Sequence, residues 1–138
     1  MNFFSLMDVT ASGLRAQRAR METVASNLAN ASTTRTAESG PYRRRDVVFE
    51  AAPAGGFRTA LDRAVRGVRV SGVVEDPAPP NLRYEPGHPD ADAQGYVAYP
   101  NVNVVTEMVN LLGAARSYEA NLTVFEATKS LMLKALEI

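Results

Sequence analysis

Two stretches decide the fold of this chain: LMDVTASGLRAQRARMETVASNLAN at residues 6–30 and VVTEMVNLLGAARSYEANLTVFEATKSLMLKALE at residues 104–137. In each stretch, apolar residues recur every seven positions along two lines that lie three or four residues apart. This repeat keeps one apolar stripe facing a partner helix. The stretches therefore predict two long helices that pack on each other, on other subunits, or on both. The residues predicted to form this assembly seam are Met7, Leu14, Met21, Val24, Leu28, Met108, Leu111, Tyr118, Leu122, Phe125 and Met132.

The segment between the two predicted helices has a different character. Proline and glycine recur throughout it, and they separate short runs that are rich in β-branched and aromatic residues. Such runs predict strands at residues 42–50, 68–74, 82–84 and 96–99. Leu61, Ala64 and Val65 predict one brief helical turn between the first two strands.

Together these elements predict an α+β fold in three parts. Residues 1–34 hold the N-terminal helix and residues 101–138 hold the C-terminal helix, and the two form a coiled-coil layer. Residues 35–100 form a small, loop-rich β module that is inserted between the helices.

Local signals at the helices add three expectations. Ser5 is suited to cap the first helix, and Asn101 or Asn103 the second, because short polar side chains accept hydrogen bonds from free N–H groups at a helix start. Gly113 lies within the second helix, where glycine costs about 1 kcal/mol relative to alanine. We expect a close backbone approach by a neighbour to explain this glycine.

Composition excludes several classes of protein. The 15 basic and 15 acidic side chains balance, whereas a nucleic-acid-binding protein needs an excess of Lys and Arg. The absence of cysteine removes disulfides and thiol chemistry. The N-terminus lacks the basic region of a secretory leader, and no apolar run approaches the roughly 18 residues of a membrane span. We therefore expect no nucleic-acid partner and no integral membrane segment.

The single histidine raises the hypothesis of a metal site. His88 precedes Asp90 and Asp92, and their spacing to Gly95 resembles the start of a calcium-binding loop. The twelfth position of such a loop needs a bidentate Glu, but this chain has Asn101 there. Two prolines within four residues favour a rigid turn instead. We therefore predict no metal site and no cofactor.

The other candidates for chemistry are a run of arginines and the surroundings of His88. In a strand, alternation sends Arg44 to the opposite face from Arg43 and Arg45, so the three arginines form no single anion-binding patch. A solvated edge or an intersubunit salt bridge is the favoured interpretation. His88 has no nucleophile motif around it. The sequence therefore predicts that the protein is not an enzyme.

Several motifs resemble those of the flagellar axial proteins, the family of rod, hook and related subunits. ASGLRAQR at residues 11–18 and ASNLAN at 25–30 resemble the N-terminal signature of the whole class. The match to the proximal-rod members is carried by VEDP at 74–77, YEPGHPDAD at 84–92, GYV at 95–97, PNVN at 100–103, RSYEAN at 116–121 and ALEI at 135–138.

The resemblance implies a structural subunit of the bacterial flagellar rod, located in the basal body where the rod crosses the periplasm. It implies that the partners are other copies of this chain, other rod proteins and the flagellar type III export apparatus. It also implies export without a cleaved signal peptide, and terminal helices that form an inner layer of the rod. Two alternatives stay open from the residues alone: a soluble metal- or ligand-binding module that uses His88, Asp90 and Asp92, and a helical-hairpin adaptor of the export apparatus.

Overall fold

The computed structural model describes residues 3–38, 40–53 and 66–137. The predicted α+β class is confirmed, with a helix at each end and two small antiparallel sheets between them. The turn predicted at Leu61, Ala64 and Val65 lies outside the described residues. In chain order the elements are α1 (Phe3–Ala29), β1 (Arg45–Pro53), β2 (Arg66–Glu75), β3 (Asn81–Tyr84), β4 (Tyr96–Tyr99) and α2 (Val104–Leu136).

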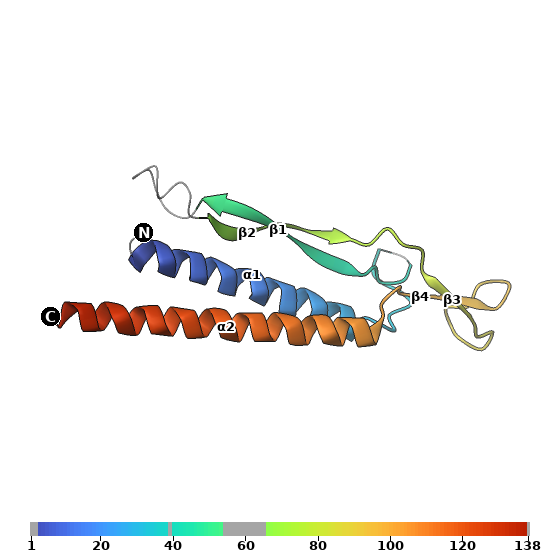
Figure 1. Cartoon of the computed structure of the whole chain (residues 1–138). Coiled ribbons are helices and arrows are strands. Elements are labelled where there is room, and N and C mark those ends of the chain that lie inside the picture. The colour runs from blue at the N-terminus through green and yellow to red at the C-terminus, as the bar shows by residue number, and fades with distance from the viewer. Residues whose placement is uncertain (1–2, 39, 54–65, 138) are drawn as a thin grey trace.

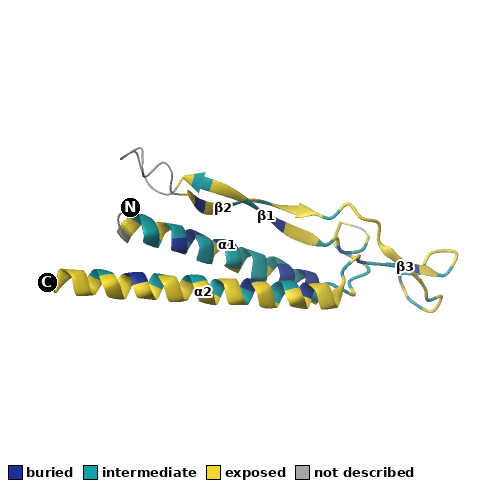
Figure 2. Cartoon of the chain, viewed as in Figure 1, coloured by how far each residue is buried: buried dark blue, intermediate teal, exposed yellow. Residues whose placement is uncertain are grey.

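The elements form an elongated molecule in which α1 is the central layer (Figure 1). The ribbon of β1 and β2 packs along one side of α1, and α2 packs antiparallel along the other side. Both chain ends therefore lie at the same end of the molecule, and the β3–β4 hairpin extends past the opposite end (Figure 1). Among the described helices and strands, α2 packs on α1 alone. Most of the surface of α2 is consequently exposed (Figure 2).

Two lines of residues run along the face of α2 that is turned toward α1. One line coincides with the predicted seam, and the other lies one residue earlier in the sequence than predicted. The least exposed positions of α2 alternate at spacings of four and three, as a heptad requires. Met108 and Leu122 of the predicted seam are 54% and 38% exposed in the single chain. The positions one residue earlier, Glu107 and Asn121, are less exposed, because their polar side chains form contacts within the chain. The positions with this spacing are Glu107, Leu111, Ala114, Tyr118, Asn121, Phe125, Thr128 and Met132; Asn110 and Ala115 are half-buried as well.

On α1, one predicted seam residue, Val24, is buried. Met7, Leu14, Met21 and Leu28 are half-buried, because α1 shares its apolar surface between α2 and the β ribbon. That the predicted seam also joins one subunit to another stays a prediction.

The helix starts settle the capping expectations. The Asn103 side chain accepts a hydrogen bond from the Thr106 N–H at 3.1 Å, so Asn103 is the cap of α2. The predicted Ser5 cap is wrong, because α1 already includes Phe3 and Ser5 therefore lies within the helix. Glu107 in the first turn and Lys134 in the last turn complement the dipole of α2.

The two strand pairs match the predicted runs to within three residues at their starts. In the longer pair, Arg45 lies opposite Glu75 and Glu50 lies opposite Arg69, and both pairs form exposed ion pairs. The pairing shifts between Val48 and Phe49, and the Arg20 guanidinium of α1 lies 4.3 Å from the Phe49 ring centroid. This stacking helps to hold the ribbon on α1.

The two glycines in the helices have opposite surroundings. A Cβ on Gly113 would meet no atom within 4 Å, so the expected close approach to this residue does not occur among the residues that the structure describes. A Cβ on Gly13 of α1 would lie 3.1 Å from the Asn121 Oδ1 atom of α2. The close contact between the two helices is therefore at Gly13.

We predict that Gly113→Ala raises the free energy of unfolding by up to about 1 kcal/mol, because the helix gains propensity at no steric cost. Gly13→Ala should gain less or destabilise, because Asn121 has to move. Thermal unfolding followed by circular dichroism measures both changes. If Gly13→Ala stabilised the chain as much as Gly113→Ala, the contact with Asn121 would not constrain the helix pair.

Candidate functional site

The most constrained group of side chains lies where α1 ends and α2 begins. At its centre is Asn27 of α1, which is fully buried. Its Nδ2 donates to the Arg45 carbonyl at 2.7 Å and to Glu107 Oε2 at 2.9 Å. Its Oδ1 accepts from the Tyr42 hydroxyl and from the Arg45 N–H, each at 2.9 Å. Every hydrogen-bonding capacity of the Asn27 amide is therefore used.

The second member of this group, Glu107 of α2, is 1% exposed. Its Oε2 accepts from Asn27, and its Oε1 accepts from the Arg44 Nε at 2.9 Å. Arg44 also reaches Asp46, with 3.4 Å between the Arg44 Nη1 and Asp46 Oδ2 atoms. The Glu107 charge is thus matched by one cation and one amide. We call Asn27, Tyr42, Arg44 and Glu107 the polar junction.

Electrostatics favour the charged form of Arg44 in this junction. Burial lowers the pKa of its guanidinium, but the hydrogen bonds to Glu107 and Asp46 and the charges of these two carboxylates together raise it by more, so the pKa lies above its ordinary value. A buried carboxylate without such a partner would cost several kcal/mol. The ion pair therefore ties the chain before β1 to the first turn of α2, and Asn27 ties both of them to α1.

Sequence reasoning found only part of the junction. It placed Arg44 on the opposite face from its neighbours, and Arg44 is indeed less exposed than Arg43 and Arg45. The interpretation of Arg44 as part of a solvated edge or of an intersubunit salt bridge is wrong, because its partner Glu107 lies in the same chain. Asn27 lies in the ASNLAN motif, from which no role was predicted for it. Its position beside the last apolar residues of α1 is the sequence feature that indicates its burial.

The residues of the metal hypothesis serve the β3–β4 turn. His88 Nδ1 accepts from the Asp90 N–H at 3.1 Å, and Asp92 Oδ1 accepts from the Tyr96 N–H at 2.9 Å. Asp90 accepts from the Thr34 hydroxyl and pairs with Arg35. Within the described ranges, no three His, Asp or Glu side chains gather in a way that could hold a metal ion.

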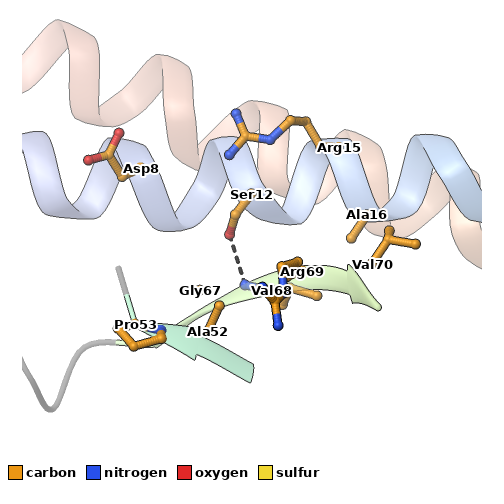
Figure 3. A pocket seen from close by; sticks show the side chains of 10 residues that line it. All are labelled: Asp8, Ser12, Arg15, Ala16, Ala52, Pro53, Gly67, Val68, Arg69 and Val70. Atoms are coloured by element: carbon orange, nitrogen blue, oxygen red, sulfur yellow. Dashed lines mark hydrogen bonds between the residues drawn. The ribbon is translucent and has the colours of Figure 1, made fainter. Parts of the chain in front are cut away.

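A shallow cleft of about 470 Å³ lies between α1 and the β1–β2 ribbon (Figure 3). The Ser12 hydroxyl accepts from the Val68 N–H at 3.0 Å and donates to the Val9 carbonyl at 2.6 Å. Ser12 therefore anchors β2 to α1 at the floor of the cleft (Figure 3). With its hydroxyl used in this way, Ser12 serves as a structural contact.

The other distinctive feature is the exposed surface of α2. Large apolar side chains are at least one-third exposed along its whole length: Val104, Val105, Met108, Val109, Leu112, Leu122, Val124, Leu131, Leu133 and Leu136. Exposed large apolar side chains in this number on one helix are typical of an interaction site. It is not a membrane span, because none of the described helices is long and apolar enough to cross a bilayer.

Comparisons with known proteins relate the chain to flagellar basal-body rod proteins. A family model described as "Flagella basal body rod protein" matches residues 7–35, and another described as "Flagellar basal body rod FlgEFG protein C-terminal" matches residues 93–138. The chain is 46% identical to the flagellar basal-body rod protein FlgC of Yersinia enterocolitica, with all of this chain and 98% of the relative covered. It is 45% identical to FlgC of Bacillus subtilis (100% and 99% covered) and 42% identical to FlgC of Borreliella burgdorferi (100% and 98% covered).

We predict that Arg44→Met lowers the free energy of unfolding by about 3 kcal/mol, because it leaves the Glu107 carboxylate buried without its cation. Combining it with Glu107→Met should recover part of this loss. Urea unfolding measures both variants. Arg43→Met, one residue away and exposed, is the matched control and should change stability by less than about 0.5 kcal/mol. Equal effects at positions 43 and 44 would contradict the role of the junction.

We predict that His88→Ala is nearly neutral, costing at most about 1 kcal/mol, because it removes one acceptor at a partly exposed turn. Calcium or zinc ions should leave the melting temperature of the original chain unchanged. Differential scanning calorimetry with and without each ion is the measurement. A metal-dependent rise in melting temperature that His88→Ala abolishes would restore the metal hypothesis.

Proposed function

Because the chain belongs to the FlgC family of flagellar basal-body rod proteins, we propose that it is a structural subunit of the proximal rod that assembles helically through its terminal helices and transmits motor torque. The relatives are named as components of the basal body, and a rod component acts through packing rather than through catalysis. In this proposal the chain resides in the basal body, in the part of the rod that crosses the periplasm.

The observation that carries the proposal is the exposed apolar surface of α2. Among the described helices and strands this helix packs on α1 alone, and it exposes large apolar side chains elsewhere on its surface. Burying such side chains contributes about 25 cal/mol per Å² of apolar surface, which favours association with further helices. Met108 and Leu122 of the predicted seam belong to this surface. They support contacts between subunits better than contacts within one.

A shaft also needs subunits that resist bending and twisting. The antiparallel pair of α1 and α2 gives an elongated body, and the polar junction fixes the angle at which the chain leaves one helix and enters the other. Head-to-tail contacts between identical subunits produce helical assemblies, because each copy offers two different faces. Torque would then pass through rigid side-by-side contacts between helices.

In this proposal each of the three predicted parts of the chain has its own place in the rod. Residues 1–34 and 101–138 form the inner layer, and residues 35–100 form the outer module. The partners are further copies of the chain, other rod proteins and, before assembly, the flagellar type III export apparatus. The hydrogen bonds from Asn27 to the backbone of Arg45 would link the inner layer to the outer module.

We predict that Leu122→Asp abolishes incorporation into basal bodies and leaves the free subunit folded. The side chain is already 38% exposed, so a charge is tolerated in water but not in a buried contact between helices. Phe125→Asp should also block incorporation, but it should destabilise the subunit as well, because Phe125 is half-buried against α1. Basal bodies purified from a bacterium that carries only the variant copy provide the measurement.

The adjacent substitution Thr123→Asp is the matched control. Thr123 is exposed on the same turn, outside the predicted seam, and its variant should incorporate normally. Normal motility and full occupancy for Leu122→Asp would rule out a seam at this position. Failure of the unaltered chain to co-purify with basal bodies would overturn the proposed function itself.

A further inference from the structure

Two different faces of α2 lie on either side of its contact with α1. One face is a ridge formed by Val105, Met108 and Leu112, which are 71%, 54% and 62% exposed. The other face carries Asn110, Gly113 and Ser117. Heptad geometry separates the centres of these two faces by roughly 150° around the helix axis. The ridge and the second face are therefore nearly opposite one another.

The second face forms one wall of a groove of about 520 Å³. The side chains on this wall are small, and a Cβ on Gly113 would have no neighbour within 4 Å. The opposite wall comes from α1 and from the chain at the start of β1. The groove is lined by Arg20, Val24, Arg44, Asp46, Val109, Asn110, Gly113, Ala114 and Ser117. Space beside a helical glycine is suited to accept bulky side chains from another helix.

The two faces carry opposite charges that lack ionic partners. Arg20 lines the groove and stacks on Phe49, but it forms no ion pair within the described part of the chain. Glu119 lies one heptad after Leu112, on the same line as the ridge, and is exposed. It also lacks an ion pair among the residues described. The opposite signs of the two faces favour contact between copies of the chain.

We propose that the α2 ridge of one copy inserts into the groove of a second copy, with Glu119 of the first copy facing Arg20 of the second. The inference rests on the proposed function and deepens it, because it assigns the two faces through which neighbouring copies meet. The contact is heterologous, since each copy uses a different face, and it can therefore repeat from copy to copy. Because the faces are less than 180° apart, a row of copies curves. The line of Arg116, Thr123 and Ser130 then lies on its concave side.

Engineered cysteines test the contact, because the chain has none of its own. Leu112→Cys marks the ridge and Ser117→Cys marks the groove. In basal bodies that contain the double variant, a short bismaleimide should link copies into a ladder of dimers and larger products. Neither single variant should give more than one-tenth of that cross-linked product.

Three results would overturn the inference. Dimers from Leu112→Cys alone would indicate a ridge-to-ridge contact. Basal bodies that contain the double variant but give no ladder, or that link it only to a different protein, would show that another occupant fills the groove. Absence of the unaltered chain from basal bodies would overturn the proposed function and the inference with it, and it is distinguished by blotting before cross-linking.

Filling the groove is a second, independent test. Gly113→Leu places a side chain in open space, so the free subunit should melt at the same temperature or higher, while incorporation should fall at least tenfold. Arg116→Leu, on the concave line outside both faces, is the matched control and should incorporate normally. Glu119→Arg should also reduce incorporation, and adding Arg20→Glu should restore it. Loss without rescue in the double variant would exclude the proposed pairing of charges.

Discussion

The structure depends on one buried carboxylate. Glu107 is almost inaccessible to solvent, so its charge has to be matched within the protein by Arg44 and by the amide of Asn27. These partners come from the chain before β1 and from the end of α1. A single electrostatic requirement therefore links the end of α1, the chain before β1 and the first turn of α2. Asn27 can satisfy this requirement because its amide has as many donors and acceptors as it has partners.

The rotation of α2 explains why so much apolar surface is exposed. With Glu107 turned toward α1, the positions seven, fourteen and twenty-one residues later follow it, and these are Ala114, Asn121 and Thr128. The larger neighbours Met108 and Leu122 remain exposed. Packing within the subunit thus uses small and polar residues on this line, and in the proposed function the bulky residues are available for contacts with other chains. This distribution suits a protein whose most extensive apolar contacts form only in an assembly.

The presence and approximate position of each described helix and strand could be predicted from sequence, because heptad periodicity and the positions of proline and glycine are local signals. The facing side of α2 could not, because an apolar stripe predicts burial somewhere and does not say whether the partner is in the same chain. The same limit applied to Arg44, whose partner is 63 residues away. Asn103 was predictable as a cap because capping depends on the next three residues. Gly13 was overlooked, because its contact with Asn121 is visible only once both helices are placed.

The distance along the chain between Asn27 and Glu107 also sets the order in which this protein can fold. The two residues are 80 positions apart, and α2 is the final element. A chain synthesised from its N-terminus cannot close the helix pair until α2 (Val104–Leu136) has emerged. Contacts between such distant segments form slowly, because the entropy of loop closure is lost before the contact contributes any stability. Until α2 has been made, α1 therefore lacks its partner helix within the chain.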